Sequence, residues 1–80
     1  MSWENTPVSV TVMKRAAINS ILAEWGDVTL GALATKTPYE IMRLPKCGPI
    51  SARSVADILA RAKAGEDVRH PMHKPIGEPA

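Results

Sequence analysis

Residues 37–59 read TPYEIMRLPKCGPISARSVADIL, and this stretch decides the fold because it contains two helix start signals. At the first signal, Thr37 is placed to cap a helix and Pro38 suits the first helical position. Glu40 lies where a capping box needs an acidic residue. Together these three residues predict the start of a short helix.

A pair of prolines brackets the turn that follows. Pro45 ends the first helix, and Pro49 fits the first position of a second helix. Between them, Gly48 can adopt a backbone conformation that bulky residues avoid. The second helix is expected to end at Gly65. Its inward side is predicted to consist of Ile50, Val55, Ile58, Leu59 and Ala62.

The rest of the chain also has helical spacing. Apolar residues recur every three or four positions between Val10 and Trp25, which predicts a helix that starts anywhere from Ser9 to Val12. A short helix through Ala34 should follow, capped by Asp27 or Thr29. Because no strand pattern or repeat occurs, we predict an all-α fold of four to five short helices in one compact domain.

The ends of the chain differ in composition from this helical region. We expect residues 1–8 to be a flexible segment with Trp3 as its main anchor, and residues 9–65 to form the domain. The proline-rich tail, residues 66–80, has no periodicity. Disorder is our preferred interpretation of this tail. The alternative is a strap held on the surface by Val68, Met72 and Ile76.

Length and charge limit the classes of protein to which this sequence can belong. Eighty residues allow one small domain, and the single cysteine, Cys47, excludes an internal disulfide. No stretch is apolar enough to span a membrane or resembles a signal peptide, so we expect a cytoplasmic protein. The net charge is +2, but residues 8–64 hold eight lysines and arginines against four acidic residues. An anionic partner is therefore plausible.

Catalytic and metal-binding patterns are weak. The predicted domain contains no histidine and no recognisable carboxylate pair, and Cys47 has no nearby base. His70 and His73 lie in the tail without a third ligand. We therefore expect neither an enzyme, nor a metal site, nor a cofactor. We expect Cys47 to be a buried apolar residue.

The turn between the two prolines has the chemistry of a phosphate-binding site. The amides of Ile50 and Ser51 should point outward from a helix N-terminus, where the helix dipole favours an anion. The Ser51 hydroxyl would add a further donor. Lys46 on the turn and Arg53 in the first helical turn would supply full positive charges.

This turn resembles the helix-hairpin-helix motif, which binds the DNA backbone through turn amides, usually across the minor groove. The residues that fit the motif are Leu44, Pro45, Gly48, Pro49, Ser51, Ala52 and Val55. Cys47 stands at its buried aliphatic position. Lys46 replaces the first glycine of the motif, so we expect a different or more strained turn.

A longer resemblance runs from Val12 to Ala62. This region is similar to the C-terminal domain of the bacterial RNA polymerase alpha subunit, and it implies a SAM-like helical fold. Helix-hairpin-helix domains of small actinobacterial nucleoid proteins share a similar turn. In the polymerase domain an arginine and an asparagine of the first helix contact DNA. Arg15 and Asn19 lie near those positions with a spacing one residue too long, so Lys14 or Arg15 only approximates them.

Three hypotheses follow for the function. The leading one is a protein of the nucleoid or of transcription regulation that binds double-stranded DNA without reading sequence. Its expected DNA-binding residues are Lys14, Arg15, Arg43, Lys46, Gly48, Ile50, Ser51 and Arg53. The second is a small, phage-encoded interaction module that binds RNA polymerase or another host protein through Val8, Tyr39 or Met72. The third is a helical domain whose turn serves packing alone. The oligomeric state stays open.

Overall fold

The computed structural model of the protein describes residues 2–73. Its α-helices are α1 (Arg15–Trp25), α2 (Leu30–Leu33), α3 (Pro38–Met42) and α4 (Pro49–Lys63), and its 3₁₀ turns are η1 (Trp3–Asn5), η2 (Val8–Val10) and η3 (Pro71–His73). This part of the chain contains two isolated β-bridges and no strand. The prediction of an all-α domain with four short helices is confirmed.

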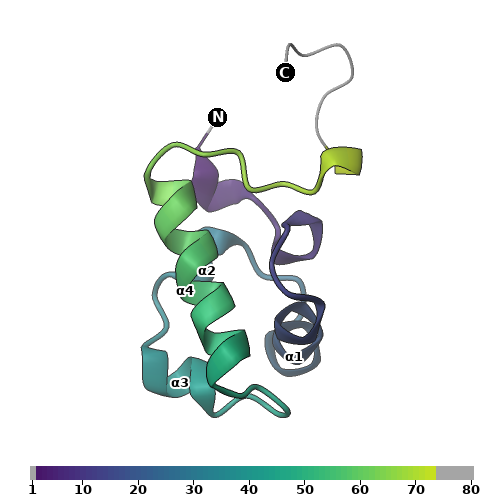
Figure 1. The fold of residues 1–80 in the computed structure, drawn as a ribbon, viewed down its shortest axis with the longest axis vertical. Coiled ribbons are helices and arrows are strands. Elements are labelled where there is room, and N and C mark those ends of the chain that lie inside the picture. The colour runs from purple at the N-terminus through teal and green to yellow at the C-terminus, as the bar shows by residue number, and fades with distance from the viewer. Residues whose placement is uncertain (1, 74–80) are drawn as a thin grey trace.

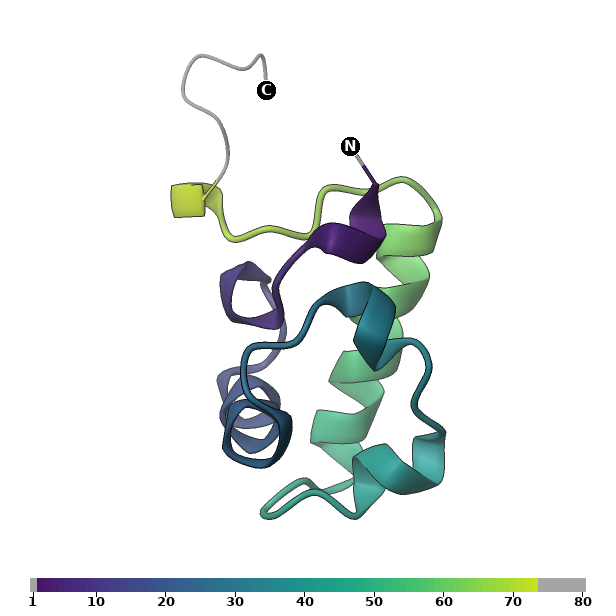
Figure 2. The same cartoon turned by 180° about the vertical axis from the view of Figure 1, so that it is seen from behind.

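Helix α4 runs along the molecule, and the other helices are arranged around it (Figure 1). Helix α1 packs against α4 and crosses it at a steep angle, whereas α3 packs at the N-terminal end of α4. Seen from behind, α2 lies beside η1 (Figure 2). The core between these elements includes Ile18, Ile21, Leu30, Leu33, Ile41, Val55 and Ile58.

The start of α3 follows from the capping box. The Glu40 amide donates to Thr37 Oγ1 over 3.2 Å, and the Thr37 amide donates to Glu40 Oε2 over 2.7 Å. This second bond lowers the pKa of Glu40 because it stabilises the carboxylate. Pro38 occupies the first helical turn, as predicted.

Helix α2 is capped by Thr29, which was one of two predicted caps. Thr29 Oγ1 accepts a hydrogen bond from the Ala32 amide at 3.3 Å. Asp27 has a different role: it accepts hydrogen bonds from both the amide and the hydroxyl of Ser9. It therefore ties the α1–α2 connection to the N-terminal region.

Helix α1 begins later than the apolar spacing suggested. The expected start was between Ser9 and Val12, but residues 8–10 form η2 and α1 starts at Arg15. The Val12 amide donates to the Val68 carbonyl, and the His70 amide donates to the Val10 carbonyl at 2.6 Å. This pairing requires an extended backbone around residues 10–12, and extended residues cannot form part of an α-helix. At its other end α1 stops at Gly26, whose φ of 78° requires glycine.

Residues on both sides of the expected domain, residues 9–65, take part in packing. Val8 is fully buried, and its amide donates to the Val28 carbonyl. Val68 is buried as well, so residues 66–70 follow the strapped alternative rather than the preferred disorder. Met72 is exposed, and Ile76 lies outside the described residues.

The inward side of α4 differs from the prediction at its first turn. Ile50 was expected to face the core, but it is 70% exposed. Ser51 is buried instead, in line with Val55, Ile58 and Ala62. Positions 51, 55, 58 and 62 follow spacings of four, three and four residues, which keep them on one helical face. Ile50 lies off that face.

Candidate nucleic-acid interface

Residues 43–48 connect α3 to α4, and we call them the α3–α4 turn. Leu44 and Cys47 are buried and anchor the turn to the core, whereas Pro45, Lys46 and Gly48 are exposed. The Cys47 amide donates to the Leu44 carbonyl at 3.1 Å, which closes the turn. The exposed part of the turn is therefore held on two apolar anchors.

Lys46 is the strained residue of this turn. Its φ is 58°, the only positive φ among the non-glycine residues that the structure describes. The expectation of a strained turn at the position of the missing glycine is therefore confirmed. The expectation for Gly48 is wrong: its φ of −89° and ψ of −175° are open to any residue, and a Cβ there would meet nothing within 4 Å. Lys46, not Gly48, makes the reversal.

Cys47 behaves as the sequence predicted for a buried apolar residue. Its residual exposure is small, and burial raises the pKa of its thiol. The thiol lies 3.9 Å from the Gly48 carbonyl oxygen. A thiol held protonated in this way fills space beside Leu44 and is not an activated nucleophile.

The N-terminus of α4 leaves backbone donors without acceptors. Gly48 is its N-cap and provides no side chain for capping. The Ala52 amide donates to the Gly48 carbonyl, but the amides of Ile50 and Ser51 have no acceptor within residues 2–73. Described residues of the C-terminal segment do not cover them either, because that segment pairs with residues 10–12. Two main-chain donors are thus open at this end.

Ser51 is placed differently from the expectation of an exposed donor. It is only 5% exposed, because it faces the core side of α4. Its hydroxyl has no hydrogen-bond partner among the described residues. Every fully buried side-chain oxygen of these residues does have a partner, so the Ser51 oxygen is not fully buried. The Ser51 hydroxyl therefore keeps a small contact with solvent beside the two open amides.

The four helix N-termini fall into two classes. Side chains cap α2 and α3, through Thr29 and Thr37. No side chain caps α1 or α4, whose N-cap residues are Lys14 and Gly48. The capped start of α3 carries an acidic residue in its first turn, whereas neither uncapped helix does. The two uncapped ends are the ones that would attract an anion.

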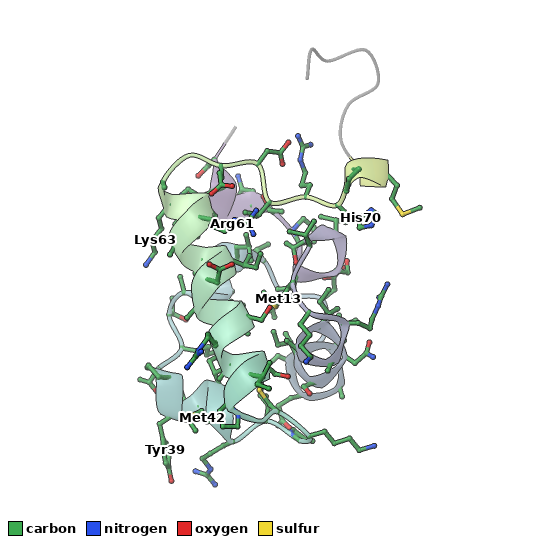
Figure 3. All side chains as sticks on the ribbon, in the orientation of Figure 1. Met13, Tyr39, Met42, Arg61, Lys63 and His70 are labelled. Carbon is green, nitrogen blue, oxygen red and sulfur yellow. The ribbon has the colours of Figure 1, made fainter. Side chains whose placement is uncertain are left out.

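Positive charges lie around these two ends without acidic partners. The exposed cations of the candidate site are Lys14, Arg15, Arg43, Lys46 and Arg53. None of them forms an ion pair with a described residue, whereas Arg61 pairs with both Asp57 and Glu66. Figure 3 shows Arg61 and Lys63 near the C-terminal end of α4, away from the end where Tyr39 and Met42 lie. Lys63, at that far end, forms no ion pair with a described residue either, so the candidate site differs from it by its open amides as well as by its cations.

Two hydrogen bonds bring α1 to the same region. The Lys14 amide donates to Ser54 Oγ at 3.0 Å, which places the start of α1 beside the second turn of α4. Ser20 Oγ donates to the Pro45 carbonyl at 2.7 Å and so holds α1 against the α3–α4 turn. The structure thereby brings Lys14 to the side of the candidate site. Arg15, the first residue of α1, is exposed and makes no side-chain hydrogen bond or ion pair with a described residue.

Exposed apolar side chains accompany the cations; exposure of Tyr39 was expected from the sequence, whereas that of Met42 and Ile50 was missed. Tyr39, Met42 and Ile50 are all exposed, and they belong to α3 and to the first turn of α4. The Arg43 guanidinium lies 5.4 Å from the centre of the Tyr39 ring, within cation–π range. Of the apolar residues expected in a protein-binding patch, Tyr39 and Met72 are exposed, but Val8 is buried.

Comparison of the chain with protein-family models, with curated proteins and with solved structures gives no match. The resemblance to the helix-hairpin-helix motif and to the polymerase alpha domain therefore stays a prediction. The function must therefore be inferred from the geometry of the α3–α4 turn.

The described part of the chain has the features of neither a metal site nor a membrane-spanning helix. Residues 2–73 contain no group of three metal-ligating side chains close enough to hold an ion. No helix in this part is long and apolar enough to cross a bilayer.

Proposed function

We propose that the protein binds the phosphate backbone of double-stranded DNA through the α3–α4 turn and the first turn of α4. The observation that carries the proposal is the coincidence, at one end of the molecule, of open backbone amides and unpaired cations. The amides of Ile50 and Ser51 would hold one phosphate. Lys46 and Arg53 would neutralise its charge and that of its neighbours.

The local electrostatics support this assignment. A helix N-terminus attracts an anion through its exposed N–H groups and its dipole. At α4 no side chain competes for those N–H groups, and no acidic residue lies in the first turn. The first acidic residue along α4 is Asp57, and it pairs with Arg61. An approaching phosphate would therefore meet donors and cations without local repulsion from α4.

Binding of this type should be weak and sensitive to salt. Contacts to phosphate carry no sequence information, and a protein with few of them binds in the non-specific range of about 10⁻⁴–10⁻⁶ M. Each neutralised phosphate contributes about 0.9 to the slope of log affinity against log salt. We propose binding without base-specific readout, in agreement with a nucleoid-associated or transcription-regulating role.

The test compares two variants of α4, each of which lacks one positively charged side chain. Arg53→Ala removes a cation from the first turns of α4, and Lys63→Ala removes one from its last turn. Fluorescence anisotropy with a random-sequence duplex over a range of salt should show a slope reduced by about one unit for Arg53→Ala. Lys63→Ala has the same net charge and should keep the slope of the unchanged protein.

The double variant Lys46→Ala/Arg53→Ala extends this comparison, and its slope should fall by about two units. All these side chains are exposed, so circular dichroism should show a normal fold for each variant. Equal effects of Arg53→Ala and Lys63→Ala would mean that net charge alone drives binding, and the proposed site would be wrong. Binding that does not respond to salt would also refute it.

A further inference from the structure

An exposed isoleucine lies in the middle of the proposed phosphate-binding site. Ile50 is the second residue of α4, follows the α3–α4 turn directly, and is 70% exposed. It contributes nothing to the core, because the buried face of α4 begins at Ser51. Lys46 precedes it in the turn and Arg53 follows it by three residues, so a large apolar side chain separates two unpaired cations.

The direction of this side chain follows from helix geometry. In an α-helix each Cα–Cβ bond tilts toward the helix N-terminus. The Ile50 side chain therefore leans toward the same end of α4 at which its own amide is open. A DNA strand whose phosphate is bound there would have its sugar, or the adjacent groove, against the isoleucine.

Two further exposed apolar side chains belong to α3, which packs against α4. They are Tyr39 and Met42, the last residue of α3. Figure 3 shows Met42 and Tyr39 at the end of the molecule where α3 meets the beginning of α4. The Tyr39 ring is within cation–π range of the Arg43 guanidinium, whereas no such contact within residues 2–73 engages Met42 or Ile50.

Isoleucine and methionine belong to the side chains that proteins insert between base steps from the minor groove. Insertion unstacks the step and bends the duplex, and it costs less where the step is flexible or already disturbed. Phosphate contacts alone would not distinguish such duplexes from rigid ones. Apolar insertion beside a phosphate would distinguish them.

We propose that Ile50, assisted by Met42 of the adjacent helix α3, is inserted into the minor groove next to the phosphate bound by α4. The substrate class would then be duplex DNA that unstacks easily, such as pyrimidine–purine steps or mismatched pairs, rather than rigid A-tracts. This inference rests on the proposed function, since the duplex must first be bound by its backbone. It assigns the selectivity to shape and deformability rather than to hydrogen bonds with base edges.

The experiment measures affinity for three labelled duplexes of equal length and charge. One carries a central A-tract, one a central TA step, and one a single central mismatch. The unchanged protein should bind the mismatched duplex at least about fivefold more tightly than the A-tract, with the TA step between them. Ile50→Ala should bring this ratio close to one. Met72→Ala is the matched control, because Met72 is similarly exposed but lies in η3 at the opposite end (Figure 1), and it should keep both the ratio and the salt slope.

The outcomes separate this inference from the proposed function. Salt-dependent binding with equal affinity for the three duplexes would overturn the inference and leave the phosphate-binding proposal intact. A ratio that survives in Ile50→Ala would also overturn it, and would leave the exposed apolar residues for a protein partner. No binding of any duplex would overturn both proposals. Bending measured by energy transfer between the duplex ends should decrease in Ile50→Ala if the inference is correct.

Discussion

Replacing Lys46 by glycine should stabilise the protein and at the same time weaken its binding to DNA. Lys46 has a φ of 58°, in the left-handed region where a Cβ approaches the following carbonyl oxygen. That conformation costs a non-glycine residue about 1–2 kcal/mol. Glycine removes the cost but gives back about 0.4–1 kcal/mol, because it makes the unfolded chain more flexible. The net gain lies within about 0–1.6 kcal/mol and centres on about 0.8 kcal/mol, or about 3–6 °C in Tm for a domain of this size.

The assay combines thermal unfolding, followed by circular dichroism, with the anisotropy titration of a duplex. Lys46→Ala is the control, because it removes the same charge but retains the Cβ. Both variants should lose about one unit of salt slope, and only Lys46→Gly should gain stability. If Lys46→Gly were no more stable than Lys46→Ala, the turn would not hold residue 46 at positive φ. The assigned geometry of the α3–α4 turn would then be wrong.

Two further substitutions test the open amides and the N-terminal packing. Gly48→Ser places a hydroxyl at an N-cap whose backbone is already extended, so it should add about 0.3 kcal/mol of stability relative to glycine. It should also reduce duplex affinity, because the hydroxyl competes for the Ser51 amide. Gly48→Ala, which cannot cap, should leave affinity unchanged, and a Gly48→Ser protein that binds DNA normally would argue against the amides. Gly31→Ala would bring a Cβ to 2.8 Å from Glu4 Cβ and 3.0 Å from the Glu4 carbonyl oxygen. Urea unfolding should therefore show a loss of about 1–3 kcal/mol in the free energy of unfolding. An unchanged unfolding midpoint would mean that η1 does not pack on α2.

The helices could be predicted where local chemistry decides the backbone. The capping box at Thr37 and Glu40 depends only on residues three positions apart, and it is present as expected. Pro49 begins α4 as expected, whereas α3 ends at Met42, three residues before Pro45, where the sequence predicted its end. The burial of Cys47 and the strain at Lys46 also followed from the sequence, because a cation stands where the resembling motif has glycine.

Features that depend on distant segments could not be predicted. The late start of α1 arises from pairing between residues 10–12 and 68–70, which lie far apart in the chain. The outward position of Ile50 depends on which face of α4 meets α1. The buried face of α4 begins one residue later than predicted, at Ser51 instead of Ile50. The open amides of α4 also depend on distant segments, none of which brings an acceptor to them within residues 2–73. Of the candidate site, the residue types and the exposure of Tyr39 were therefore predictable, but the exposure of Met42 and Ile50 was not.

The positions of the two ends of the described part of the chain, residues 2 and 73, have a practical consequence. Residue 2, in front of η1, and residue 73, in η3, both lie at the end of the molecule opposite the α3–α4 turn (Figures 1 and 2). A fluorophore or a surface linkage attached beside either residue would leave the turn open to solvent. Two copies fused through these ends would carry their turns on opposite outer sides. Such a tandem protein could tether two duplexes to each other, with an avidity set by the length of the linker.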